Sequence, residues 1–204
     1  MIDTVLAIPP FVVRLRSPFA DVAAHVARFY GDAAVDPRDD PFVDFDLQVE
    51  RGQAHRRWWH PQARFLLDGV EPFHPLPASQ AAPMFEWGLN WCIAQRAMGY
   101  LVMHAAVVAR GDDALMMPGV PGAGKSTLCA SLVHGEGWRL LSDELAILDT
   151  DDGLLRPHPR PISLKNQSIP LVTALPGARL APVHVDTRKR TLSHAAPPPA
   201  ARAG

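Results

Sequence analysis

Residues 119 to 127 are the stretch that decides the fold, and they read Gly119-Val120-Pro121-Gly122-Ala123-Gly124-Lys125-Ser126-Thr127. They fit the pattern G-x-x-x-x-G-K-[ST], the phosphate-binding loop of proteins that hydrolyse nucleotides or transfer phosphoryl groups. A triphosphate carries dense negative charge, and such a loop surrounds it with backbone N–H donors. Glycines at 119, 122 and 124 let the backbone approach the phosphates and take positive φ. The stretch therefore predicts a nucleotide-binding loop made of all nine residues.

Lys125 and Ser126 carry the charge and the metal ligand of this loop. We expect a helix to begin near Lys125, so that its N-terminal amides and positive dipole end face the phosphates. Lys125 then reaches the β- and γ-phosphates, and the Ser126 hydroxyl ligates Mg²⁺. The apolar run 114–117 before the loop predicts a buried strand, and residues 127–133 after it are compatible with a helix. Strand, loop and helix in this order are the context that the motif requires.

Composition narrows the class of protein. The chain has 204 residues and a formal net charge of −1, which gives no electrostatic argument for nucleic acid or an anionic membrane surface. Cys92 and Cys129 stand in apolar surroundings, and we expect two buried thiols without a disulfide or a metal. No apolar run reaches membrane-spanning length, and the N-terminus lacks the basic region of a signal peptide. We therefore expect a cytoplasmic protein, in the compartment where ATP is available.

The chain is expected to have two parts and a tail, with α/β structure in both parts. Residues 1–98 predict a mixed α/β region, and residues 99–194 predict a P-loop kinase core. Residues 195–204 contain only Ala, Pro, Arg and Gly and are predicted to be disordered. The periodic patterns predict a strand at 11–16, a helix with Val22, Val26, Phe29 and Tyr30 on one face, an alternating strand at 43–49, a helix at 84–98 and a strand at 100–108.

Asp143 is the acidic residue best placed to act with the loop. Phosphoryl transfer needs an acidic side chain for the metal or for the incoming hydroxyl. Asp143 follows an apolar pair and lies 17 residues after Ser126, a gap that one helix and one strand fill. We therefore expect Asp143 to return beside the loop, with Glu144 as a further metal ligand. Arg160 and Lys165 are candidate clamps on a phosphate or an acceptor, because cations stabilise a transferring phosphoryl group.

The segment from Tyr100 to Glu144 resembles the catalytic domain of HPr kinase/phosphorylase, a bacterial protein-serine kinase with a phosphate loop. In that family a His precedes the loop and an Asp pair follows the loop helix, and the matching residues here are His104 and the pair Asp143-Glu144. Over nearly the whole chain the sequence is similar to the subgroup called HprK-related kinase A. The stretches that carry this resemblance read Phe65-Leu66-Leu67-Asp68-Gly69, Glu86-Trp87-Gly88-Leu89-Asn90-Trp91, Arg160-Pro161-Ile162-Ser163-Leu164-Lys165 and Asp186-Thr187-Arg188-Lys189.

The resemblance implies a fold like that of phosphoenolpyruvate carboxykinase in place of the ordinary doubly wound nucleotide-binding sheet. It implies an ATP- and Mg²⁺-dependent kinase that acts on a protein or peptide serine, with Asp143 as general base, His104 beside it and a homo-oligomeric assembly. Glu144 stands where the parent family has Asp, a departure that bears on the phosphorylase half of the parent activity. The subgroup usually continues well beyond residue 189, so the resemblance also implies a C-terminally shortened core.

Two other functions fit the loop and the acid. One is a small-molecule kinase of the shikimate or gluconate kinase type, which also places an Asp one helix and one strand after the loop. Such enzymes usually start close to the loop, whereas about a hundred residues precede it here. The other is a nucleotide-binding regulator or fragment without catalytic turnover.

Overall fold

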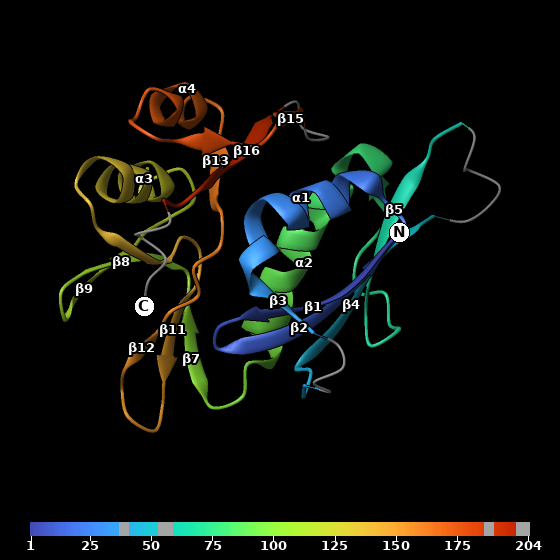
Figure 1. Ribbon diagram of the computed structural model, residues 1–204, viewed down its shortest axis with the longest axis horizontal. Coiled ribbons are helices and arrows are strands. Elements are labelled where there is room, and N and C mark those ends of the chain that lie inside the picture. The colour runs from blue at the N-terminus through green and yellow to red at the C-terminus, as the bar shows by residue number, and fades with distance from the viewer. Residues whose placement is uncertain (37–40, 53–58, 186–189, 199–204) are drawn as a thin grey trace. The chain divides into compact units, whose positions relative to one another are not determined.

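The computed structural model describes residues 1–36, 41–52, 59–185 and 190–198 (Figure 1). The chain is mixed α/β, with four α-helices and several sheets in the described residues. It divides into two compact units, Met1–Arg96 and Ala97–Gly204, while the expected boundary followed residue 98. Within the described ranges no helix combines the length and the apolar character that a membrane crossing needs.

The first unit is built on a six-stranded sheet in the order β3-β1-β2-β4-β5-β6. Strands β2 and β4 pair in parallel, and the other neighbours pair antiparallel. Alternate residues of β4, namely Phe45, Leu47 and Val49, are buried, which confirms the period-2 pattern. The bounds are β1 (Ile2–Ile8), β2 (Phe11–Ser17), β3 (Ala34–Val35), β4 (Phe45–Arg51), β5 (Gln62–Leu67) and β6 (Leu76–Pro77).

Two helices, α1 (Ala20–Tyr30) and α2 (Ala81–Arg96), pack together over one face of this sheet (Figure 1). Single 3₁₀ turns occupy Gly31–Ala33 and Ala78–Gln80. The predicted face of α1 is the buried one. Helix α2 begins three residues before the expected position 84, because proline is tolerated in the first turn of a helix, where its missing N–H has no partner to lose.

A buried carboxylate joins the two helices. Glu86 of α2 is only 3 % exposed, and its Oε1 lies 2.6 Å from His25 Nε2 of α1. The Tyr30 hydroxyl donates to the same carboxylate, 2.9 Å from Oε1 and 3.0 Å from Oε2. A buried carboxylate is tolerated only when such partners satisfy it, so the cluster fixes the register of α1 against α2.

Helix α2 lies so close to β5 that only glycine fits at its point of contact. A Cβ atom added at Gly88 would overlap the ring of Phe65, a fully buried side chain of β5. The missing side chain at Gly88 therefore sets how near the helix comes to the sheet.

We predict that Gly88→Ala lowers the free energy of unfolding by about 1–3 kcal/mol, because the new methyl group overpacks the contact with Phe65. Urea unfolding of the whole chain measures this. Gly31→Ala is the matched control: Gly31 has helical backbone angles, and its added Cβ meets no atom within 4 Å. Equal stability of the two variants would show that the helix can move away from the sheet at little cost.

The described residues of the second unit form three small sheets, with orders β10-β8-β9, β12-β11-β7 and β13-β16-β14, and β15 also pairs with β16. All their strand pairs are antiparallel. The bounds are β7 (Tyr100–Met103), β8 (Ala105–Arg110), β9 (Asp113–Pro118), β10 (Arg139–Ser142), β11 (Ala146–Asp149), β12 (Leu155–Arg156), β13 (Ile162–Lys165), β14 (Arg179–Leu180), β15 (His184–Val185), β16 (Thr191–Ala196), α3 (Lys125–Gly135) and α4 (Ser168–Thr173).

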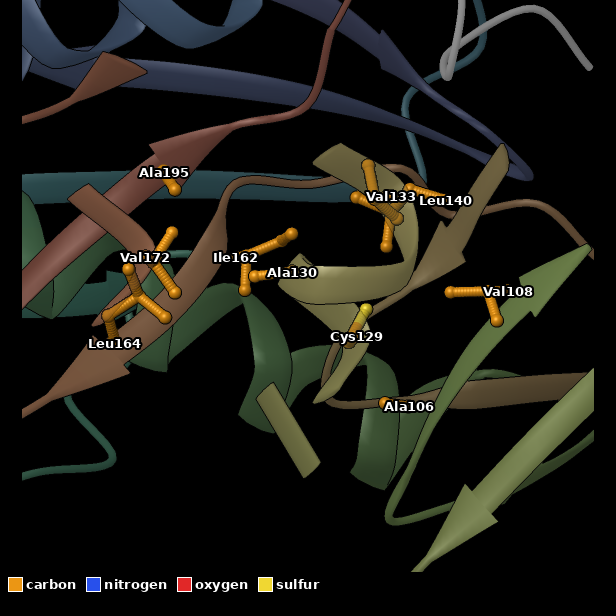
Figure 2. Close-up of a cluster of buried hydrophobic side chains, with 10 residues drawn as sticks. All are labelled: Ala106, Val108, Cys129, Ala130, Val133, Leu140, Ile162, Leu164, Val172 and Ala195. Carbon is orange, nitrogen blue, oxygen red and sulfur yellow. The ribbon is translucent and has the colours of Figure 1, made fainter. Parts of the chain in front are cut away.

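Helix α3 forms the centre of this unit's main core. Its small side chains Cys129 and Ala130 are fully buried, together with residues of β8, β10, β13, β16 and α4 (Figure 2). Both cysteines are buried and free, as predicted. Burial raises the pKa of the Cys92 thiol to about 12 and that of Cys129 further still, so neither is a reactive thiolate.

Three expectations for the second unit are wrong. The stretch 100–108 is not one strand, since the chain bends at His104 and passes from one sheet to another. Strand β9 is an exposed edge where a buried strand was expected, with Leu115 41 % and Met116 37 % exposed. The expected disorder from residue 195 fails at Ala195 and Ala196, which belong to β16 and pair with β13 and β14. Residues 199–204 and the stretch 186–189 lie outside the described residues.

Candidate functional site

The phosphate loop connects β9 to α3, as the motif requires. Gly122 and Gly124 have φ of 88° and 87°, a left-handed conformation that side chains disfavour, and Gly124 is the N-cap of α3. Gly119 does not have a positive φ, so the expectation for this residue is wrong. An alanine Cβ there would make only an ordinary contact, 3.5 Å from the Cβ of Ala123. The conformation therefore depends on two of the three glycines.

The loop is open to solvent at the end of α3. Residues 119–124 are exposed, while Lys125, Ser126 and Thr127 at the start of the helix are partly buried. The first amides of a helix have no acceptor within it, and they carry its positive dipole end. Free amides beside an exposed loop are an arrangement suited to an anion.

Lys125 lies across the loop and bonds to the loop's own carbonyls. Its Nζ donates to the carbonyl oxygen of Gly119 at 2.6 Å and to that of Val120 at 3.3 Å. These bonds keep the ammonium group over the loop. A bound phosphate would compete with the two carbonyls for this ammonium group, because ionised acceptors make the stronger hydrogen bonds.

Asp143 meets the loop where the spacing predicted. Its Oδ2 accepts a hydrogen bond from the Ser126 hydroxyl at 3.1 Å and another from the Ser163 amide at 2.8 Å. The side chain is almost completely buried, and its Oδ1 has no hydrogen-bond partner within the described residues. One carboxylate thus joins the first turn of α3 to strand β13.

A bend in two paired strands places Asp143. Strands β8 and β10 pair in one sheet, and β7 and β11 pair in another. The chain passes from one sheet to the other twice, at His104 between β7 and β8 and at residues 143–145 between β10 and β11. A β-bulge at Leu141 precedes the turn at residues 143–145. The Ser142 hydroxyl accepts a hydrogen bond from the Leu145 amide at 3.2 Å across this turn. Ser142 pairs with Val107 before this turn, and Ala146 pairs with Met103 after it. His104, which lies between Met103 and Val107, is therefore opposite the turn at residues 143–145. His104 is exposed there.

Burial makes the charged form of Asp143 costly. Desolvation is the largest cause that raises the pKa of this carboxyl from its ordinary 3.8 to about 7, and the charge of Glu144 adds to the rise. The Ser163 amide, the Ser126 hydroxyl and the charge of Lys165 act in the opposite direction. A carboxyl with a pKa near neutrality is suited to exchange a proton at physiological pH.

Glu144, Lys165 and Arg160 are the other residues predicted for this site. Glu144 is partly buried beside Asp143, and Lys165 is exposed at the end of β13, where its charge reaches Asp143. Arg160 is buried just before β13. The Ser163 amide was not predicted, because a backbone N–H leaves no mark on the sequence, although Ser163 lies inside the Arg160 to Lys165 segment that was singled out.

The oxygen atoms at this centre fit Mg²⁺. The Ser126 hydroxyl and the Asp143 carboxylate are hard ligands, and the buried Oδ1 without a partner is the kind of atom that a cation or a hydroxyl donor would satisfy. Among the described residues, no three His, Cys, Asp or Glu side chains are grouped to hold a metal ion by themselves. That arrangement suits Mg²⁺, which usually takes one or two protein oxygens, with substrate phosphates and waters as its other ligands.

No protein-family model and no curated protein matches this chain in the comparisons with known proteins.

We predict that Asp143→Asn changes how the free energy of unfolding depends on pH. The folded chain holds a proton on Asp143 up to a pH of about 7, whereas the unfolded chain loses it near 3.8. This group therefore lowers the free energy of unfolding as the pH rises between these values, and asparagine removes that loss. Urea unfolding should show Asp143→Asn gaining stability relative to the unchanged chain from about pH 4 to about pH 7.

Asp151→Asn is the control for this experiment, because it removes an exposed carboxylate from the turn between β11 and β12. This variant should show no such gain. If Asp143→Asn also shows none, the carboxylate of Asp143 is not held in a dehydrated site.

Proposed function

We propose that this chain is an ATP- and Mg²⁺-dependent phosphotransferase that moves the γ-phosphate to a serine hydroxyl of a protein or peptide. The observation that carries the proposal is the buried Asp143 carboxylate, hydrogen-bonded to the first turn of the helix that ends the phosphate loop. A carboxylate at this place can meet both the metal and the acceptor hydroxyl. The sequence resemblance to HprK-related kinase A supports the serine acceptor.

The strand arrangement favours a core of the HPr kinase and phosphoenolpyruvate carboxykinase type over a doubly wound sheet. A doubly wound nucleotide-binding sheet is mostly parallel. In the second unit all the described strand pairs are antiparallel, and β8 separates β9 from β10. This observation counts against the small-molecule kinase of the shikimate kinase type.

The residues of the loop would bind and orient the nucleotide. The amides of Gly122 and of residues 124–127 would donate to the phosphates, whereas the Ala123 amide donates to the Val120 carbonyl at 3.2 Å. Lys125 would leave the two loop carbonyls to neutralise the β- and γ-phosphates. Ser126 and Asp143 would hold Mg²⁺, with Glu144 beside them. When bound there, the ion supplies positive charge that offsets the charge developing on the phosphates.

Asp143 would then act on the acceptor. The acceptor oxygen attacks the γ-phosphorus, the bond from this phosphorus to the bridging oxygen breaks, and ADP leaves with that electron pair. The hydroxyl proton passes to Oδ1 of Asp143, which no described donor occupies. Lys165, whose charge already reaches this carboxylate, and Arg160 would stabilise the transferring group. His104, opposite the 143–145 turn, would adjust the proton affinity of Asp143.

We predict that Lys125→Ala weakens Mg²⁺–ATP binding by about tenfold to a hundredfold, since a charge-assisted hydrogen bond contributes about 1.5–3 kcal/mol. Asp143→Asn keeps an amide oxygen that can still contact Mg²⁺, so this variant should keep nucleotide binding within a few-fold and lose transfer. Calorimetric titration with Mg²⁺–ATP measures the binding, and phosphoserine formed on a pool of serine peptides measures the transfer. Asp151→Asn, which removes a distant exposed charge, should change neither quantity.

Three results would decide against parts of this proposal. A folded chain that binds no Mg²⁺–ATP would refute the nucleotide site. Binding without any turnover would favour a nucleotide-binding regulator. ADP formation that depends on a metabolite and not on a peptide would favour the small-molecule kinase.

A further inference from the structure

Strand β13 pairs with a strand along one edge and contacts Asp143 along the other. One edge pairs with β16, where Ser163 lies directly opposite His194. The Ser163 amide points to the other edge and donates to Asp143. Since the N–H and C=O of a residue point to the same side of an antiparallel strand, Ser163 and His194 form a pair that is not hydrogen-bonded through the backbone. Side chains are closest in pairs of this kind.

The Ser163 side chain does not belong to the core. Its neighbours Ile162 and Leu164 are fully buried in the core around α3, and alternation places Ser163 on the opposite face of the strand. Ser163 is partly exposed there, next to the buried His194 on the same face. The Ser163 hydroxyl is therefore next to the His194 imidazole. It belongs to the same residue as the backbone amide that donates to Asp143.

We propose that Ser163 is a phosphorylation site that the chain modifies on itself, in cis, with ATP bound at its own phosphate loop. This inference rests on the proposed phosphotransferase function. A continuous series of contacts supports it: Ser126 binds Asp143 at 3.1 Å, and the same carboxylate oxygen binds the Ser163 amide at 2.8 Å. Among the described serines, Ser126 bonds to the Asp143 side chain through its hydroxyl and Ser163 through its backbone amide, and the Ser126 hydroxyl is the one assigned to the metal.

The reaction balances with ATP as the only co-reactant. The Ser163 Oγ forms a bond to the γ-phosphorus, and the bond from that phosphorus to the β,γ-bridging oxygen breaks. ADP leaves with the electron pair, and the hydroxyl proton passes to the Asp143 carboxylate. Phosphoserine then carries a charge of about −1.5 to −2 close to Asp143 and to the phosphate site. The single Ser163 hydroxyl limits the reaction to one phosphate per chain, and repulsion between like charges weakens the next binding of Mg²⁺–ATP.

Labelled ATP tests the proposal on the whole chain. The purified protein is incubated with Mg²⁺ and γ-labelled ATP, and intact mass and peptide mapping locate the phosphate. We expect one phosphate on Ser163, formed at a rate per chain that does not change with protein concentration. Calorimetric titration of the phosphorylated chain should then show weaker Mg²⁺–ATP binding than that of the unmodified chain.

The variants separate the hydroxyl from the fold. Ser163→Ala removes only the hydroxyl, because the contact with Asp143 uses the backbone amide, and this variant should lose the phosphate. Ser163→Thr restores a hydroxyl and should give phosphothreonine. Ser79→Ala, which removes the hydroxyl of an exposed serine in the first unit, is the matched control and should still be phosphorylated on Ser163. Circular dichroism checks that each variant is folded.

Binding by the unmodified chain distinguishes the two proposals. If the folded chain binds Mg²⁺–ATP but Ser163 carries no phosphate, or if the phosphate lies on another residue, the inference about Ser163 is overturned and the nucleotide site stands. A rate per chain that rises in proportion to protein concentration overturns modification in cis. If Mg²⁺–ATP does not bind at all, both proposals fall.

Discussion

The second unit depends on the burial of helix α3 against two separate sheets. Small residues on this helix, Cys129 and Ala130, let β8 approach from one sheet and β13 from another, and a larger side chain at either position would separate them. The helix is thereby fixed at its first turn, where the phosphate loop ends. Asp143 reaches this turn from β10 and Ser163 reaches Asp143 from β13, so one packed helix aligns three segments that are far apart in the sequence.

The carboxylate of Asp143 is buried beside the first turn of α3. A dehydrated carboxylate resists ionisation, and burial is the largest cause that raises the pKa of Asp143. Two hydrogen bonds offset part of this cost, and Oδ1 is left without a partner among the described residues. The fold thus holds a polar group in a state that a cation or a hydroxyl donor would relieve. A buried polar atom without a hydrogen-bond partner is typical of a functional site, whereas buried polar atoms with a structural role usually have their partners.

Short sequence patterns predicted those parts of the fold that depend on residues close together in the chain. The conformation of the loop before α3 follows from Gly122 and Gly124, and one helix plus one strand was enough to return Asp143 to Ser126. The bend at His104 could not be predicted, because the run 100–108 contains no glycine or proline to interrupt it. Strands β14 and β15 have two residues each, too few for any periodicity, and the pairing of Ile162 with Ala195 joins residues 33 positions apart. The Ser163 amide is a backbone group, which any residue except proline could supply.

The exposed edge of β9 has a consequence for how the protein behaves in concentrated solution. Natural edge strands usually carry a lysine, an inward-pointing charge or a covering loop that prevents pairing with another chain. Between Ala114 and Met117 this strand has no charged residue, and Leu115 and Met116 are both exposed on it. The middle of the strand that leads into the loop therefore has an exposed edge without a charged side chain, and a lysine in place of Leu115 would protect this edge against pairing with another chain.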